Sequence, residues 1–473
     1  MSLFLGCAHV RSTFDDFTHA PEHITPGTAA APNVPWTAPS NAVPPPLVKP
    51  SPILPNGVAI GSSITLDQAI DTALTNNPNT RSAWLEARAA ETALGSARSE
   101  LLPEVDLNAS FTRSRNAAQG GRSITLSDQY GPSLTLSYLL FDFGGRSARI
   151  EEARQTLIAS SFAHNQTIQD VILQVSQSYY GYLGAKSLLA AQESTVKERQ
   201  TSLDVANARH NAGVATVADV LQAQTALSQA QLNYETFEGS LHTFEGSLST
   251  AMGLSPVTRF TVGELASELP VENVSGAIDD LIKSAESARP DLAAARASAE
   301  RARARIKEVR AQGLPTLSLT SSYADTTFRG AANVTTRPYS ASLSMRFPLF
   351  TGFRNTYDIR EAETNAQLAA ENARGLAQRI DLQVWTSYYD VQTAAHRVKT
   401  SLDLLKNAEQ SADVATSRYR AGVGSILDVL TADAALESAR AQEVQARADW
   451  FVTMAQFVHD IGALEPRQES SAK

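Results

Sequence analysis

The chain has 473 residues, of which 43% are hydrophobic, and carries a formal net charge of −9. This balance is typical of a globular protein and offers no basic surface for nucleic acid, so no nucleic-acid partner is expected. No run of about 18 apolar residues is present, which excludes a transmembrane helix. A water-soluble protein, or one that enters a membrane as β-strands, remains.

The single cysteine, Cys7, follows a short apolar run near the start of the chain. One cysteine cannot form an internal disulfide framework. An apolar run that ends in Gly-Cys resembles the lipobox of a bacterial lipoprotein, where the cysteine is lipidated and becomes the mature N-terminus. We therefore expect lipidation at Cys7 if a complete signal precedes it in the native gene. The alternative is an unmodified cysteine.

Residues 1–62 hold this lipid-anchor candidate and a proline-rich stretch. Proline fixes φ and lacks an amide donor, so the stretch is predicted to be extended. From Thr65 the apolar residues recur at helical spacing. This pattern is interrupted at Pro78 and ended by Pro103, which predicts a broken helix before the first strand.

Residues 104–141 and 316–350 each predict a β-hairpin with strands of about ten residues, because apolar and polar side chains alternate. In the first hairpin a polar loop is expected over 116–129. Aromatic residues stand at the strand ends, as an interfacial girdle in a membrane requires. They are Tyr130, Phe141, Phe143, Tyr339 and Phe350.

Two helical hairpins are predicted at 146–254 and 354–463, because residues 146–210 and 355–420 contain no proline. Such helices would reach roughly 100 Å. Apolar residues recur every seven positions, which indicates coiled-coil seams between antiparallel helices. The series are Leu189, Val196, Leu203, His210; Val398, Leu405, Ala412, Tyr419; and Val220, Leu227, Tyr234, Leu241, Leu248.

The second half of the chain repeats the first. Ser178-Tyr179-Tyr180 and Asp219-Val220-Leu221 recur 209 positions later, as Ser387-Tyr388-Tyr389 and Asp428-Val429-Leu430. These offsets divide the chain into two repeats, residues 63–254 and 286–463. An equatorial linker at 255–285 joins them, and a C-terminal tail occupies 464–473. One elongated unit was thus built twice.

Four strands per chain cannot close a barrel, and open strand edges are not tolerated in lipid. Two copies would give eight strands with a filled interior, whereas three copies would give twelve strands around a polar lumen. The predicted fold class is therefore mixed and mainly α. It is a trimeric, transmembrane, 12-stranded β-barrel continuous with a second, helical barrel, with four strands and four long helical stretches from each chain.

The order of elements resembles the TolC-type outer membrane factors, the exit ducts of bacterial efflux and secretion systems. The resemblance covers roughly residues 60–463. It rests on Ile64 to Ile70 with Asn76-Asn77-Pro78, which resembles the family's first helix, and on two helix–turn–helix tips, Arg209 to Leu221 and Arg418 to Leu430. The candidate lipobox and the lack of a C-terminal extension are closer to the lipoprotein branch that serves drug and metal efflux pumps.

The resemblance implies a homotrimer in the cell outer membrane that spans into the periplasm, with a 12-stranded β-barrel continuous with a periplasmic α-barrel of 12 helices. It implies a passive exit duct for small molecules, with a periplasmic adaptor (membrane fusion) protein and an inner-membrane pump of the proton-driven RND type as partners. The outer channel of a type I secretion system, a general porin and a soluble coiled-coil scaffold are the alternatives. Only the scaffold would be extracted in water without detergent.

The resemblance also places a gate and the adaptor's docking site at the helix tips. Gly213 and Gly422 permit the tip turns, and Asp219 and Asp428 match positions where acidic side chains face the narrow end. Tyr419 matches a tyrosine that bonds to the position of Asp219. The family's gate arginine, gate threonine and second acidic residue are replaced by Gly424, Ala218 and Thr431. The alternative is that both aspartates are only helix N-terminal acids.

No enzyme is expected, since no catalytic constellation is found in the sequence. Ala421 to Ser425 lacks the strand and lysine of a phosphate loop. Ser-Tyr-Tyr is interpreted as helix packing. We therefore expect no cofactor and no metal site.

Overall fold

The computed structural model describes residues 31–34, 63–117, 124–258, 260–265, 277–329 and 333–464, with only the main chain at 115–117 and 124–127. Cys7, the rest of residues 1–62, and residues 465–473 of the tail lie outside the described residues. The described chain separates into two compact units. One takes in Glu86–Ser161 and Ala294–Arg374, and the other takes in the remainder.

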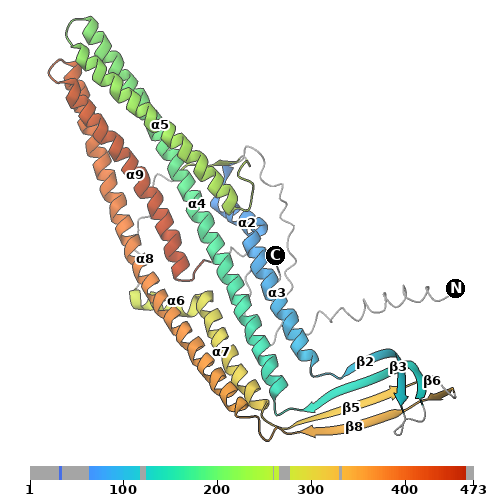
Figure 1. The fold of residues 1–473 in the computed structure, drawn as a ribbon. Helices are drawn as coiled ribbons and strands as arrows, with labels where there is room; N and C mark the ends of the chain where they lie inside the picture. Colours follow the sequence, from blue (N-terminus) through green and yellow to red (C-terminus); the bar gives the residue numbers. More distant parts are fainter. Residues whose placement is uncertain are drawn as a thin grey trace, which may run out of the picture. The chain divides into compact units, whose positions relative to one another are not determined.

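The helices of the first repeat recur in the second, as the duplication predicted; Figure 1 labels them. The helices of the described residues are α2 (Leu66–Asn76), α3 (Pro78–Ser99), α4 (Gly145–Asn211), α5 (Val217–Ala251), α6 (Ile278–Ala288), α7 (Pro290–Ala311), α8 (Arg354–Arg420) and α9 (Ile426–Asp460). The bounds of α4 and α5 recur in α8 and α9 at an offset of 209, and those of α2 and α3 recur in α6 and α7 at 212. None of the described helices is both long and apolar enough to cross a membrane.

The first unit contains an antiparallel sheet built from both repeats (Figure 1). Its strands are β2 (Glu104–Ala117), β3 (Ile124–Phe141), β5 (Thr316–Ala324), β6 (Thr326–Arg329), β7 (Val334–Thr336) and β8 (Tyr339–Arg346). The four main strands follow the order β2-β3-β5-β8. Within the described residues β2 pairs only with β3, and β8 only with β5, so both outer strands keep one edge without a partner in this chain.

The first hairpin is longer than the sequence predicted. Pairing runs without interruption from Glu104↔Ser137 to Ala117↔Ile124, so most of the predicted loop 116–129 is strand. Main-chain hydrogen bonds sustain this ladder beyond Phe111, where the apolar alternation ends. In the second hairpin, by contrast, Asp325 interrupts the strand and separates β5 from β6. There a Cβ on Gly131 would lie 1.8 Å from the Asp325 carbonyl oxygen, so only glycine allows this approach.

Apolar rows alternate with polar rows across the sheet. Leu107 stands opposite Leu134, which stands opposite Tyr323, and Leu319 stands opposite Leu343. On the other face Ser322 and Ser340 share a hydrogen bond of 2.9 Å, and Ser318 and Ser344 one of 2.8 Å. The apolar side chains Leu107, Leu343 and Met345 are exposed in this single chain.

Both strand-to-helix connections contain two consecutive residues with left-handed backbone. These are Phe143-Gly144 in one repeat and Gly352-Phe353 in the other, with the two residue types in reverse order. A left-handed phenylalanine is unfavourable and needs support from its surroundings. Phe143 packs edge-to-face on Phe141 at 4.8 Å, and Phe353 on Phe350 at 5.6 Å. Of the aromatic residues predicted at the strand ends, Phe141, Phe143 and Phe350 thus take part in pairs at these connections.

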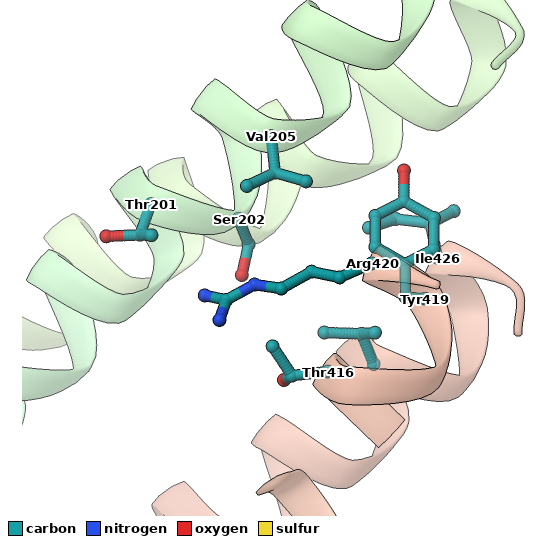
Figure 2. A pocket seen from close by; sticks show the side chains of 8 residues that line it. Thr201, Ser202, Val205, Thr416, Tyr419, Arg420 and Ile426 are labelled. Carbon is teal, nitrogen blue, oxygen red and sulfur yellow. The ribbon is translucent and has the colours of Figure 1, made fainter. Parts of the chain in front are cut away.

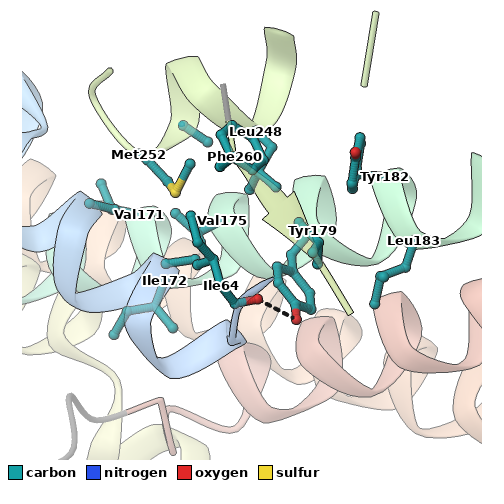
Figure 3. Packing of buried hydrophobic residues seen from close by; sticks show 14 of the residues in the cluster. Ile64, Val171, Ile172, Val175, Tyr179, Tyr182, Leu183, Leu248, Met252 and Phe260 are labelled. Carbon is teal, nitrogen blue, oxygen red and sulfur yellow. Dashed lines mark hydrogen bonds between the residues drawn. The ribbon is translucent and has the colours of Figure 1, made fainter. Parts of the chain in front are cut away.

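The second unit has its main core where α4, α5 and α2 meet a two-stranded parallel sheet (Figure 3). The sheet pairs β1 (Ser63–Ile64) with β4 (Thr261–Val262), so part of the linker predicted at 255–285 joins the first repeat. Tyr179 is buried in this core and donates a 3.2 Å hydrogen bond to the Ile64 carbonyl. Tyr180 stacks on Phe451 at 4.4 Å. The Ser-Tyr-Tyr interpretation as helix packing is confirmed in this repeat.

The seven-residue seams are confirmed in part. Val398, Ala412 and Tyr419 of α8 are buried, as are Leu227 and Leu248 of α5. In α4 the predicted register is wrong for a single chain. Leu189, Val196 and Leu203 are half-buried and His210 is exposed, whereas Ala185, Gln192, Arg199 and Ala206 form the buried series. Polar residues at two of these four positions conceal the seam from an apolar pattern.

Candidate functional site at the helix tips

The turn that joins each pair of long helices is closed in the same way. Gly213 and Gly422 have φ angles of 75° and 78°. Gly213 N–H donates to the His210 carbonyl at 2.9 Å and Val214 N–H to the Arg209 carbonyl at 3.0 Å. The second tip repeats these bonds from Gly422 and Val423. This is a Schellman motif, whose left-handed position favours glycine, and the role predicted for both glycines agrees with this geometry.

Asp219 and Asp428 occupy the third helical position of α5 and α9, where each completes a capping box. Thr216 N–H donates to Asp219 Oδ2 at 2.9 Å, and Ser425 N–H to Asp428 Oδ2 at 3.0 Å. These bonds from Ser425 lower the pKa of Asp428. Within one chain both carboxylates therefore act as helix caps, as the alternative interpretation expected.

A contact that the sequence did not predict joins the two tips. Arg209 Nη1 donates to the Tyr419 carbonyl at 2.7 Å, and the guanidinium carbon lies 4.7 Å from the centroid of the Tyr419 ring. A charged hydrogen bond and a cation–π contact thus connect the end of α4 to the end of α8. A signal was present in the sequence, because Arg209 and Arg418 are equivalent in the two repeats, but nothing there reveals which of them has a partner.

Tyr419 is buried against Ile426, Val429 and the side chain of Val205 (Figure 2). Its hydroxyl has no hydrogen-bond partner among the described residues, so no bond to Asp219 forms within one chain. The pKa of the Tyr419 hydroxyl is raised. Burial is the main cause and the charge of Asp219 adds to it, while the charge of Arg209 acts in the opposite direction. The recess here has room for little more than a water molecule. It is lined by Thr201, Ser202, Val205, Thr416, Tyr419, Arg420, Ile426 and Val429.

The position that corresponds to the family's gate arginine is crowded. A Cβ at Gly424 would lie 3.2 Å from both Arg418 Cβ and the Tyr419 main-chain nitrogen. Thr431 uses its hydroxyl within α9, where it donates to the Leu427 carbonyl at 2.8 Å. Within one chain, neither residue connects the two tips.

Further from the tip, a buried ion cluster joins α4 to α9. Arg199, whose side chain is 5% exposed, lies 3.1 Å from Asp433 and 3.5 Å from Glu437. Arg440 makes two hydrogen bonds to Glu198, at 2.8 and 2.9 Å. The two helical hairpins of one chain are therefore held together by charge as well as by apolar packing.

The described residues contain no group of three or more His, Cys, Asp or Glu side chains that could hold a metal ion. The tips offer capped turns, apolar side chains and a few charges. This composition suits contact between helices.

Comparison with known proteins decides the family. The model of the outer membrane efflux protein family matches residues 69–254 and 281–458. The chain belongs to the outer membrane efflux protein family. Protein CyaE of Bordetella pertussis is 30% identical over 393 residues, which cover 80% of each chain. Outer membrane protein TolC of Escherichia coli is 25% identical and covers 86% of this chain and 84% of its own.

Solved structures of outer membrane channels share the fold. The outer membrane protein VceC of Vibrio cholerae superposes with a TM-score of 0.74 at 20% identity, over 84% of this chain and 96% of that one. The CmeC channel of Campylobacter jejuni gives 0.76 at 18% identity, over 87% and 90%. This member of the efflux family is thus an outer membrane channel component that spans into the periplasm, and the family's role is transport. The soluble scaffold is set aside.

Proposed function

We propose that three copies of this chain form one channel, in which the two repeats of each copy contribute equivalent halves. The observation that carries this proposal is the four-strand main sheet, whose outer strands β2 and β8 have no second partner in the described part of the chain. Unpaired edges are not tolerated in lipid. Three copies would pair every edge and give a barrel of twelve strands with a polar lumen, above a tunnel of twelve helices.

The trimer is tested by native mass measurement in detergent and by heat-modifiable migration on gels. A mass of three chains that falls to one chain on heating is expected. A monomer in detergent, or a protein extracted without detergent, contradicts the proposal.

As partners we propose a periplasmic adaptor protein and an inner-membrane pump of the proton-driven RND type, with small molecules as cargo. Relatives carry names such as pyoverdine export outer membrane protein OpmQ, of Pseudomonas aeruginosa, and toluene efflux pump outer membrane protein TtgC, of Pseudomonas putida. Cross-linking in cells followed by mass spectrometry tests this proposal. Recovery of an adaptor with an RND pump supports it, and recovery of a protein-secreting transporter favours the type I alternative.

At the tips we propose a gate in which Gly213 and Gly422 hold the turns, and Asp219 and Asp428 line the narrow end. Tyr419 would bind the Asp219 position when the gate is closed. The buried Tyr419 hydroxyl without a partner among the described residues supports this.

A hydrogen bond to a charged group contributes about 1.5–3 kcal/mol, so Tyr419→Phe and Asp219→Ala should raise bilayer conductance. Asp428→Asn should weaken cation preference, and Asp403→Asn on α8 serves as the control. Unchanged conductance and selectivity in all three would remove these residues from the gate.

For Cys7, which lies outside the described residues, we propose lipidation as an additional membrane anchor. Intact mass of the mature N-terminus tests it. An unmodified cysteine there would remove the anchor and leave the channel as proposed.

A further inference from the structure

The two tips of the chain have equivalent residues but unequal surroundings. At an offset of 209, Val217 corresponds to Ile426 and Leu221 to Leu430. Ile426 is 3% exposed and Leu430 is half-buried, whereas Val217 and Leu221 are 59% and 58% exposed. By contrast, the turn residues Val214 and Val423 are both exposed, at 64% and 68%. The difference therefore concerns one helix face and not the whole tip.

The cover of the second tip comes from the first repeat. Val205 of α4 packs against Ile426 and Tyr419, and Arg209 binds the Tyr419 carbonyl. The counterparts of Val205 and Arg209 in the second repeat are Val414 and Arg418 on α8. Val414 is 58% exposed, and Arg418 is exposed as well. The contact is therefore formed once within the chain, between α4 and the second tip. The residues for a second, equivalent contact are present but exposed, with Val414 and Arg418 on the second repeat and Val217 and Leu221 on the first.

We propose that the unused contact forms between copies of the chain, with Val414 and Arg418 of one copy covering Val217, Leu221 and His210 of the next. The proposal rests on the trimer proposed above and adds to it the residues that meet at the tip. A heterologous contact of this kind closes into a ring when the rotation between copies permits. His210 is the counterpart of Tyr419, so Arg418 donates to the His210 carbonyl of the next copy.

The interface between copies differs from the internal one in its polar contacts. Internally, α4 and α9 are joined by the Glu198–Arg440 pair and by the cluster of Arg199, Asp433 and Glu437. At an offset of 209 none of the counterparts of these five residues carries a charge. In the same order, the counterparts are Asn407, Gln231, Ala408, Gln224 and Ser228.

The contact between copies therefore keeps the apolar side chains and the tip arginine but lacks the ion pairs.

The test is cysteine cross-linking in the full chain in membranes. Val217→Cys combined with Val414→Cys is expected to give reductant-sensitive dimers and trimers on denaturing gels. Either substitution alone should give no such ladder, because Val217 meets Val414 and not a second Val217. The matched control is Val205→Cys with Ile426→Cys, which places the same pair inside one chain and should yield cross-linked monomers. The parent chain, with Cys7 alone, is the blank.

The contact between copies would be overturned if the channel is trimeric in detergent and the Val205/Ile426 control forms its disulfide, but the Val217/Val414 pair yields no ladder. That result would leave the proposed function intact. A monomeric channel would overturn both. Arg418→Ala in the double variant is expected to slow cross-linking several-fold, whereas Lys406→Ala, at an exposed lysine on the same helix, should not. Equal rates would overturn the role of Arg418.

Discussion

At the scale of single residues, the tip glycines are required by backbone geometry and not by space. A Cβ at Gly213 would meet no heavy atom within 4 Å, and one at Gly422 would meet only Arg209 Nη2, at 4.0 Å. Both residues have left-handed φ, where a side chain clashes with its own backbone. The cost of a substitution here is therefore conformational.

Gly422→Ala is expected to destabilise the chain by about 1–2 kcal/mol, because alanine is strained at this φ. Gly239→Ala is its control, since Gly239 lies within α5 and a Cβ there meets nothing within 4 Å. Alanine in a helix interior gains about 1 kcal/mol over glycine. Thermal unfolding followed by far-UV circular dichroism should thus shift in opposite directions. A shift of the same sign in both would contradict this account of the turn.

At the scale of single elements, the two faces of strand β8 should differ in their tolerance of charge. Leu343 belongs to the apolar rows, whereas its neighbour Ser342 points to the opposite face and stands opposite Thr320. Leu343→Arg is expected to cost about 2–4 kcal/mol if it lies near the membrane midplane, and Ser342→Arg far less. Yield of heat-modifiable protein in the outer membrane measures this. Equal losses would mean that the assignment of faces is wrong.

The two polar contacts between α4 and α9 should also differ in strength. Arg199→Met leaves Asp433 and Glu437 without their buried cation, a change that typically costs about 3–5 kcal/mol. Arg440→Met breaks a pair whose glutamate, Glu198, is 45% exposed, so it should cost under about 1 kcal/mol. Urea unfolding of the helical signal tests both variants. Similar midpoints for the two would refute the buried cluster's role.

At the scale of the whole molecule, one histidine helps to join the two repeats. His459 of α9 lies 3.0 Å from Asp170 of α4 and 3.1 Å from Asp460, and Arg289 approaches Asp460 at 4.0 Å. Burial lowers the pKa of His459, but the bonds to the two aspartates outweigh it and raise the pKa to about 9. The imidazole is therefore charged at neutral pH.

Because this pKa lies above the usual 6.5, charged His459 stabilises the folded chain fully below about pH 6.5 and loses this effect as the pH rises through 9. The expected loss is about 1–3 kcal/mol, reduced because Asp170 is largely exposed. Unfolding midpoints measured between about pH 6.5 and 9.5 should fall less steeply in His459→Gln than in the parent. His396→Gln, at an exposed histidine, should keep the parent slope. Parallel slopes in all three would contradict the role of His459.

The sequence alone determined the elements and their duplication, because both are encoded in local patterns. Alternation at Val105 to Phe111 predicts a strand, and the proline-free stretches predict long helices. The 209-residue offset recurs in the bounds of α4, α5, α8 and α9. It also located the tip turns, since Gly213 and Gly422 stand where the backbone must be left-handed. The ladder beyond Phe111 was missed, because main-chain pairing needs no apolar signal.

Only the tertiary structure decided which of two equivalent residues has a partner. Arg209 and Arg418 occupy equivalent positions in the two repeats, yet among the described residues only Arg209 binds across to the other tip, at the Tyr419 carbonyl. Likewise, Ile426 is buried in the cluster that Val205 of α4 covers, whereas its counterpart Val217 is exposed. Within one chain only one tip is covered, because the matching cover for the first tip, Val414 and Arg418 of α8, stays exposed. The buried series at Arg199 was hidden likewise, since its partners lie more than 200 positions away and no periodicity links them.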